Sequence, residues 1–445
     1  MFKYFPHTIA DLDAMKKVVQ IENLDEMFED VPKDVLFNEE YEIPSQMSET
    51  EIRSYFAEIA KLNTEMTIFG GHGFYDHYDP SVINAIVSRQ EFLTAYTPYQ
   101  PEVAQGTLTY IFEYQSMIQT LTGMDTSNAS MYDGSTATAE AMFMAESITR
   151  RNKFLLPQNV NPLIQNVVKT YAHYKGIEIV MVEMKEGLVD RDDFMKKCDE
   201  SVAAIIVQKP NFFGLIESFN DLADYIHSKK GILIENADIS TLGVLKTPKE
   251  DGADIAVGDC QSLGMPVAFG GPTLGYMATL KQYVRKMPGR ICGMSMDTEG
   301  RRSFVLTLQA REQHIRREKA NSNICSNQSL MALYATIYLS LLGPMGLREV
   351  NELSYQGAHY LYDQLISTGK FKPVFHSPFL KEFVLETLIP QEMIQEALMN
   401  AGIVGGFSLR DDYPDFENLI SFTVTEKRTK KEIDKLIKVL EGLSW

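Results

Sequence analysis

Residues 254–275 read DIAVGDCQSLGMPVAFGGPTLG, and this stretch decides how the rest of the chain is interpreted. The apolar residues 255–257 predict a buried strand, and a polar turn and a Gly-Gly-Pro sequence at 270–272 follow it. Side chains that follow the carboxyl end of a strand often form the functional site of an α/β sheet. The polar turn contains Gln261 and Ser262 but no lysine. It therefore offers an amide and a hydroxyl where many enzymes of this architecture need an amine.

The sequence before this turn alternates between short apolar runs and longer amphipathic ones. Runs typical of strands occupy 153–157, 177–184, 203–208, 231–237 and 254–259. Because parallel strands are joined by crossover helices, this alternation predicts an α/β fold with a mostly parallel sheet. The chain has neither a G-x-G-x-x-G after its first strand nor a G-x-x-x-x-G-K-[ST], which disfavours a dinucleotide fold and a P-loop.

Three regions are expected along the chain. Residues 1–67 predict a helical N-terminal arm, since Thr8 can cap one helix and Ser48 begins a capping box for another. Residues 68–328 contain the alternating pattern and predict the large α/β domain. Residues 329–445 combine long helical patterns with short strands and predict a smaller α+β C-terminal domain.

Composition limits the class of protein. The chain has 445 residues, is 44% hydrophobic and carries a formal net charge of −18. This charge disfavours nucleic acid or an anionic membrane as a partner. No apolar run approaches the roughly 20 residues of a membrane span, and the N-terminus lacks the apolar region of a signal peptide, so we expect a cytoplasmic protein. Its scattered cysteines are expected to be reduced thiols: Cys198, Cys260, Cys292 and Cys325.

Two loops at the start of the large domain are rich in aromatic and imidazole side chains. Histidines and aspartates of the first loop match no metal-ligand spacing, so a hydrogen-bonded loop is favoured over a metal site: His72, Asp76, His77 and Asp79. In the second loop, YTPYQPE at 96–102, prolines stiffen the backbone. We expect this loop to present Tyr96, Tyr99 and Gln100.

A candidate phosphate cradle lies at 133–136, where Asp133 and Gly134 precede Ser135, Thr136 and an alanine-rich helix. Hydroxyls and free backbone N–H groups at a helix N-terminus can bind a phosphate. A well-capped buried helix explains the same residues equally well.

Pyridoxal phosphate requires three groups from an aspartate-aminotransferase-like (fold type I) scaffold: a phosphate site, an acid at a strand end, and a Schiff-base lysine one crossover later. The scaffold is present, with Glu235 at the expected acid position and Gln261 at the expected lysine position. A glutamine cannot form a Schiff base. Other lysines of this region are expected in helices or loops, away from the position that the Schiff-base lysine takes in such a scaffold: Lys246, Lys249, Lys281 and Lys286.

Long runs of the sequence resemble the P-protein family, the glycine dehydrogenases (decarboxylating). They occupy 1–15, 75–118, 122–141, 258–275, 287–293 and 300–328, and include TAYTPYQPE and LTLQAREQHIRREKA. In that family the lysine of the active half follows a histidine and precedes a glycine run and proline. Aligning the Gly-Gly-Pro of 270–272 places that histidine on Cys260 and that lysine on Gln261. The chain therefore resembles the lysine-free half, the α subunit or subunit 1 of the split enzyme.

The resemblance implies a heterodimer with a β subunit, paired again into a dimer of heterodimers. The β subunit would bind pyridoxal phosphate covalently, and this chain alone would be inactive. The enzyme would decarboxylate glycine and pass the aminomethyl group to the lipoyl arm of H-protein, with the T- and L-proteins acting later. Tyr96, Tyr99 and Gln100 are the candidates for reaching the partner's active site, whereas Asp133, Ser135, Thr136, Glu235 and Gln261 are vestigial cofactor positions.

Two alternatives remain at this point. The chain can be an autonomous pyridoxal-phosphate enzyme with a displaced lysine, which would bind the cofactor without a partner. It can also be a scaffold that stabilises or regulates a partner and lends no side chain to catalysis. The arginines of 290–317 fit either a subunit interface or an acidic H-protein: Arg290, Arg301, Arg316 and Arg317.

Overall fold

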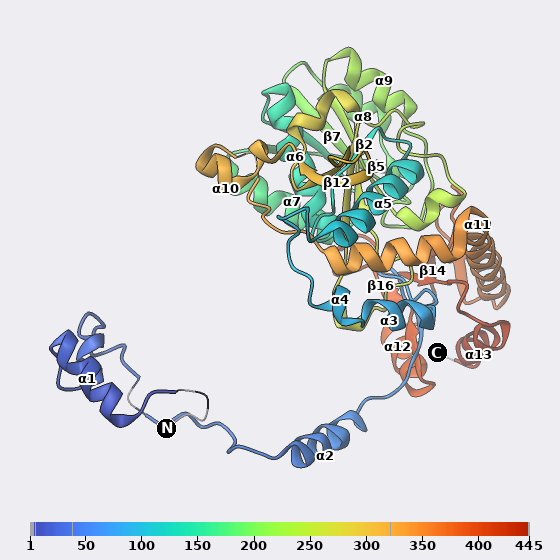
Figure 1. Ribbon diagram of the computed structural model, residues 1–445. Coiled ribbons are helices and arrows are strands. Elements are labelled where there is room, and N and C mark those ends of the chain that lie inside the picture. The colour runs from blue at the N-terminus through green and yellow to red at the C-terminus, as the bar shows by residue number, and fades with distance from the viewer. Residues whose placement is uncertain (1–3, 5, 38, 321, 444–445) are drawn as a thin grey trace. The chain divides into compact units, whose positions relative to one another are not determined.

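The computed structural model in Figure 1 describes residues 4, 6–37, 39–320 and 322–443. Its contacts divide the chain into two units, Met1–Thr64 and Glu65–Trp445, which are described separately. The first unit contains α1 (Ile9–Val19), the 3-10 helix η1 (Leu24–Phe28) and α2 (Glu49–Ala60), and none of these elements has a buried residue. Thr8 forms a capping box with Asp11, and Ser48 forms one with Glu51, as the sequence predicts.

The second unit is built on a seven-stranded sheet with the order β2-β10-β9-β8-β7-β3-β4. The pairs β3–β4, β3–β7, β7–β8 and β8–β9 are parallel, whereas β10 pairs antiparallel with both β9 and β2. The mostly parallel sheet that the sequence predicts is therefore confirmed. The strands are β2 (Thr126–Ser127), β3 (Lys153–Pro157), β4 (Glu178–Val182), β7 (Val202–Lys209), β8 (Ile232–Ala237), β9 (Ile255–Asp259) and β10 (Gly275–Thr279).

Helices cover both faces of this sheet. Alternate residues of one strand belong to different cores: Leu155 packs with α5, α8, α9 and α11, while its neighbour Phe154 packs with α6 and α7. This alternation follows from the two-residue period of a strand and explains why the strands are apolar on both faces. The helices are α5 (Gln105–Thr122), α6 (Gly134–Thr149), α7 (Pro162–Lys175), α8 (Arg191–Lys197), α9 (Asn220–Ser228) and α11 (Ser329–Ser367).

The long helix α11 leads from the large sheet to the C-terminal part of the chain. It is interrupted at Gly343 (φ 59°, ψ −174°), directly before Pro344. Among the described helices, only α11 is long and apolar enough to cross a membrane, with a mean hydropathy of 1.6 over its most apolar window. The expectation that no apolar run approaches that length is therefore wrong. The apolar character has a structural cause, because residues 332–338 of this helix supply side chains to the core against the sheet.

The C-terminal part is a small α+β assembly. Its antiparallel sheet has the order β13-β14-β17-β16, and α11 and α13 contribute to its core. Its elements are β13 (Phe371–Pro373), β14 (Glu382–Thr387), α12 (Gln391–Asn400), β15 (Ile403–Gly405), β16 (Phe407–Ser408), β17 (Leu419–Thr423) and α13 (Lys430–Glu441). β1 (Thr67–Phe69) pairs in parallel with β15, and the loop at 70–79 follows β1.

Shorter elements complete the described chain. The hairpin of β11 (Ile291–Met296) and β12 (Arg302–Thr307) follows the large sheet and packs against α5. The remaining short α-helices and strands are α3 (Ser81–Val87), α4 (Gln90–Leu93), β5 (Met184–Lys185), β6 (Leu188–Val189) and α10 (Gln313–Arg316). The remaining 3-10 helices are η2 (Ile239–Gly243), η3 (Ala268–Gly270), η4 (Lys281–Lys286), η5 (Gln309–Arg311) and η6 (Arg317–Lys319).

Candidate functional site

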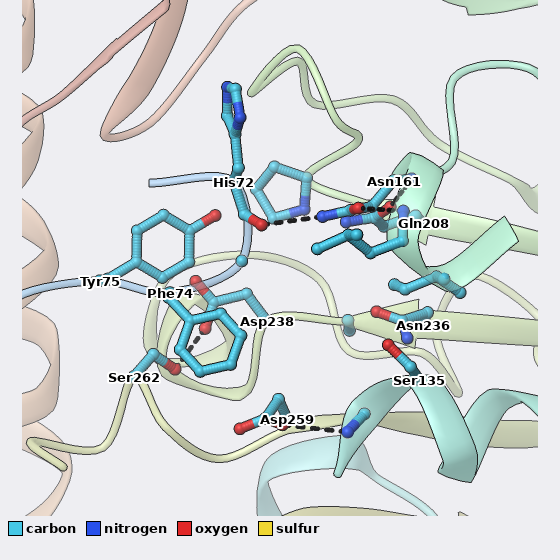
Figure 2. Close-up of a pocket in the computed structure, with 16 residues that line it drawn as sticks. His72, Phe74, Tyr75, Ser135, Asn161, Gln208, Asn236, Asp238, Asp259 and Ser262 are labelled. Carbon is cyan, nitrogen blue, oxygen red and sulfur yellow. Dashed lines mark hydrogen bonds between the residues drawn. The ribbon is translucent and has the colours of Figure 1, made fainter. Parts of the chain in front are cut away.

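A cavity of about 80 Å³ lies where β7, β8 and β9 end and α6 begins (Figure 2). A cavity needs about 10–15 Å³ of such volume to hold one water molecule, so this cavity has room for a few waters. The 70–79 loop covers it, with Phe74 projecting inward. The lining residues are His72, Gly73, Phe74, Tyr75, Gly134, Ser135, Asn161, Leu163, Ile164, Gln208, Pro210, Asn236, Ala237, Asp238, Asp259 and Ser262.

Asp238, directly after β8, is the acid at the base of this cavity. Its Oδ2 lies 2.7 Å from Nζ of Lys381, and its Oδ1 accepts a hydrogen bond of 2.5 Å from Ser262. Burial raises the pKa of Asp238, but the charge and hydrogen bond of Lys381, together with the hydrogen bond of Ser262, hold that pKa below its usual value. Asp238 is therefore an ionised acid whose counter-cation comes from the C-terminal part of the same chain.

Lys381 is 2% exposed and connects several groups of the site. Its Nζ donates to Nε2 of His77 over 3.0 Å and to Oγ of Ser240 over 3.1 Å, and it lies 3.8 Å from the ring centroid of Tyr75. Burial, reinforced by the charge of Lys381, lowers the pKa of His77. His77 is thus a neutral imidazole that accepts from Lys381 at Nε2 and donates from Nδ1 to Glu426 over 2.6 Å.

Gln261 holds the 70–79 loop closed. Its side chain is fully buried, and its Oε1 accepts from the backbone N–H of Tyr75 over 2.8 Å. Its Nε2 donates to the carbonyl oxygens of Tyr75 (2.9 Å) and Met265 (2.7 Å). Glu382 adds a second attachment, because it accepts from the N–H of His72 (2.7 Å) and from Oη of Tyr75 (3.0 Å). Gln261 therefore binds the backbone of the loop and does not line the cavity.

Carboxylates occupy the start of α6, where a phosphate cradle was one of two interpretations. Oδ1 of Asp133 accepts from the N–H of Thr136 (2.9 Å), and Oδ2 of Asp259 accepts from the N–H of Gly134 (3.0 Å). Burial, together with the charges of Asp133 and Asp238, raises the pKa of Asp259 to about 7. Of the predicted cradle residues 133–136, Gly134 and Ser135 line the cavity, whereas Asp133 and Thr136 do not.

Glu235 does not lie in the cavity, which corrects its predicted position. Strand β8 continues to Ala237, so Glu235 is inside the strand and the residue at its end is Asp238. Glu235 is fully buried, 3.2 Å from Nζ of Lys209, which also contacts Asp251. Burial raises the pKa of Glu235 despite this lysine.

These residues do not fit covalently bound pyridoxal phosphate. Among the residues that the structure describes, no lysine lines the cavity, and both polar ends of the Gln261 amide are bonded. The acid that would face the pyridine nitrogen, Asp238, already has Lys381 as its partner. At the start of α6, the carboxylates of Asp133 and Asp259 use N–H groups that a phosphate would need, and they would repel its charge. The displaced lysines of the sequence alternatives also lie outside the cavity lining: Lys246, Lys249, Lys281 and Lys286.

The YTPYQPE loop is a separate feature. Tyr96 is 83% exposed and Tyr99 is 51% exposed, Gln100 is exposed, and Pro98 between them is buried. None of these residues lines the cavity. The hydroxyl of Tyr99 accepts a hydrogen bond of 2.9 Å from Nη2 of Arg290.

The remaining predicted candidates have other partners. Among the described residues, no group of His, Cys, Asp or Glu side chains is arranged to hold a metal ion. Asp76 pairs with Lys427 and Arg428 at 2.7 and 2.9 Å. Arg301 pairs with Asp297 on the hairpin turn, and Arg316 donates to a backbone carbonyl. All four cysteines are free thiols, and only Cys325 is exposed.

Sequence reasoning missed the acids and the lysine that shape the cavity. Asp259 is the last residue of the strand in the opening stretch, and Asp238 directly follows the preceding strand, so correct strand ends would have identified both. Lys381 gave no signal, because only the tertiary fold brings it to Asp238.

Comparisons with known proteins agree with one another. The family model described as "Glycine cleavage system P-protein" matches residues 2–440. The "Probable glycine dehydrogenase (decarboxylating) subunit 1" of Desulforamulus reducens is 48% identical over 445 residues, covering 99% of this chain and 100% of that protein. The protein of the same name from Carboxydothermus hydrogenoformans is 48% identical over 443 residues, covering 99% of each.

Solved structures show the same relationship. The chain is similar to a crystal structure of glycine decarboxylase (P-protein) of the glycine cleavage system in inhibitor-bound form, with 40% identity, a TM-score of 0.89 and 99% coverage of both chains. A NifS-like protein, 12% identical with a TM-score of 0.64 and covering 84% of this chain and 98% of its own, shows the fold alone. The chain has the fold of the fold type I pyridoxal-phosphate enzymes.

Proposed function

Because this chain belongs to the family of glycine cleavage system P-proteins, we propose that it is the lysine-free subunit of a split glycine dehydrogenase (decarboxylating). Relatives that match it end to end carry the name subunit 1, which implies a second subunit. One observation supports the division of labour most directly. Gln261, at the position expected for the Schiff-base lysine, is fully buried and uses both ends of its amide to hold the 70–79 loop.

The partner β subunit then supplies the lysine, binds pyridoxal phosphate covalently, and forms a heterodimer with this chain, paired again into a dimer of heterodimers. The assembled enzyme decarboxylates glycine in the cytoplasm and passes the aminomethyl group to the lipoyl arm of H-protein, before the T- and L-proteins act. This chain alone has no activity. Its cofactor-like cavity is kept closed by Gln261, Asp238 and Lys381 and serves the stability of the subunit.

The chain's contribution to the shared active site comes from the YTPYQPE loop. Tyr96 and Tyr99 are exposed although both are large aromatic residues, and buried Pro98 anchors the loop between them. Exposed aromatic side chains on a stiff loop are typical of residues that a partner or a ligand covers. We therefore assign Tyr96, Tyr99 and Gln100 to the partner's active site and not to the cavity of this chain.

Glycine-dependent exchange of labelled bicarbonate, in the presence of H-protein, tests this assignment. We expect no exchange with this chain alone and full exchange when the β subunit is added. Exchange by this chain alone would favour the autonomous enzyme. If exchange reaches its full rate with the β subunit alone, the chain is no catalytic subunit. If exchange needs both chains but does not change when Tyr96, Tyr99 and Gln100 are replaced, this chain is a scaffold.

A further inference from the structure

We propose that Arg290 is a positioning residue, which holds Tyr99 as an outward-facing hydrogen-bond donor for a carboxylate. The inference rests on the proposed function, since it takes the YTPYQPE loop to face the active site of the partner. It adds to that function the residue that orients the tyrosine and the chemical class of the group that the tyrosine binds.

Arg290 is a buried cation whose guanidinium donates one hydrogen bond within the described chain, to Tyr99. The residue precedes β11 and is 2% exposed. Its Nη2 donates to Oη of Tyr99 over 2.9 Å, and its guanidinium carbon lies 5.2 Å from the centroid of that ring. Its Nε lies 3.6 Å from Oε2 of Glu312, and neither Nε nor Nη1 has a hydrogen-bond partner among the described residues. Burying a cation with so few hydrogen bonds costs stability. An apolar side chain would fill this position without that cost, so packing alone does not explain an arginine here.

Hydrogen bonds and a ring contact surround Arg290 and Tyr99. The N–H of Ala129 donates to the carbonyl of Arg290 over 2.8 Å. Arg311 ties the preceding loop to the following segment, since its guanidinium donates to the carbonyls of Met287 and Gly289. The ring of His314 lies 6.3 Å from that of Tyr99 at 74°, an edge contact. Tyr99 is therefore held at its hydroxyl and along one edge of its ring, while half of its side chain stays exposed.

The direction of the hydrogen bond determines what the tyrosine can do. A guanidinium has only donors, so the hydroxyl of Tyr99 must accept from Arg290 and its own proton remains free for another acceptor. A hydroxyl that accepts from a cation is polarised into a stronger donor. Such a donor prefers an anionic acceptor, and a carboxylate fits it best. That carboxylate belongs either to glycine or to an acidic side chain of the partner.

A double-mutant cycle in the assembled two-subunit enzyme tests the proposal. The variants are Tyr99→Phe, Arg290→Gln and the double variant, with Arg348→Gln, an exposed arginine of α11, as the control. Loss of one charge-assisted hydrogen bond corresponds to about a tenfold effect. If the carboxylate is that of glycine, both single variants raise the KM for glycine about tenfold. If it is a side chain of the partner, both weaken subunit assembly about tenfold and leave KM unchanged.

The double variant separates positioning from folding. Because Arg290 acts through Tyr99, we expect the double variant to be no worse than Tyr99→Phe. The proposal is overturned if the effects of Tyr99→Phe and Arg290→Gln multiply in the double variant. It is also overturned if Tyr99→Phe changes neither the KM for glycine nor subunit assembly while the wild-type pair is fully active. An inactive wild-type pair instead contradicts the proposed function. Urea unfolding of each variant monitors folding. If Arg290→Gln does not fold, Arg290→Lys replaces it in the cycle, and the same coupling to Tyr99→Phe is required.

Discussion

Replacing Lys381 with methionine tests whether this side chain holds the cofactor-like cavity closed. Lys381 is 2% exposed, and its Nζ lies 2.7 Å from Oδ2 of Asp238. No described residue other than Lys381 contacts that oxygen as a hydrogen-bond or ion-pair partner, so it depends on Lys381. Methionine retains most of the aliphatic length and removes the charge.

The expected loss follows from the burial of the pair. Removing one partner of a buried ion pair costs about 3–5 kcal/mol, because the other charge stays buried without compensation. Lys381→Met also removes the hydrogen bonds to His77 (3.0 Å) and Ser240 (3.1 Å), so we expect a loss of unfolding free energy in the upper half of this range. In the double variant with Asp238→Asn no uncompensated charge remains, and most of the loss should be recovered.

The loss also depends on pH with a defined sign. Burial raises the pKa of Asp238, but Lys381, together with the hydrogen bond of Ser262, lowers it below its usual value. In the native chain Asp238 therefore contributes stability above its unfolded pKa of about 3.9, and this is lost as the pH falls through the folded pKa. In Lys381→Met the neighbouring cation is gone and burial is opposed mainly by the hydrogen bond of Ser262. We therefore expect the folded pKa to lie above the unfolded one, so that protonation at acidic pH relieves the buried charge. We expect a smaller loss at pH 5 than at pH 8.

Urea unfolding followed by circular dichroism at both pH values measures these differences. Lys249→Met is the matched control, since Lys249 forms a partly exposed pair with Asp125 at 2.8 Å and should lose less than about 1 kcal/mol. If Lys381→Met loses no more than this control, or loses the same amount at both pH values, the ion pair does not close the cavity and the reasoning is wrong.

Three further predictions concern the same region and the thiols. Gln261→Lys should not create a cofactor site, and because an ammonium cannot accept a hydrogen bond, the buried N–H of Tyr75 is left without its partner, which should lower the unfolding free energy by about 1–3 kcal/mol; a spectrum and a urea titration with pyridoxal phosphate check both. Burial raises the folded pKa of Asp259 to about 7, so the folded protein binds this proton more tightly than the unfolded chain, and stability falls as the pH rises towards 7 and the proton is lost. Asp259→Asn removes this titration and should flatten the pH dependence of Tm between pH 5 and 8, as thermal unfolding at several pH values would show. Iodoacetamide at pH 8 should modify exposed Cys325 and spare the buried cysteines, as peptide mass spectrometry would show; modification of Cys260 in the folded chain would contradict the packing.

The sequence predicted the scaffold well because its signals are local. Capping residues placed Thr8 and Ser48 at helix starts, and short apolar runs located the strands of the parallel sheet. Long contiguous runs such as TAYTPYQPE carried the resemblance to the P-protein family, and the family match over residues 2–440 confirms it.

The site was less predictable because its contacts are long-range. An error of three positions at the end of β8 put the acid at Glu235 instead of Asp238. The pairing of Asp238 with Lys381, and of Gln261 with the backbone of Tyr75, joins segments far apart in the chain, and no local pattern indicates either. The interpretation of 133–136 as a phosphate cradle overlooked Asp259, which reaches the same helix start from β9.

The central claim is that this chain carries the pyridoxal fold without carrying the cofactor. Borohydride reduction of the assembled enzyme with pyridoxal phosphate, followed by peptide mapping of both subunits, tests it most directly. The account predicts a pyridoxyl-lysine in the partner subunit and no labelled peptide from this chain. A pyridoxyl-lysine in this chain, at Lys381 or at any other position, would contradict it and would establish an autonomous cofactor site.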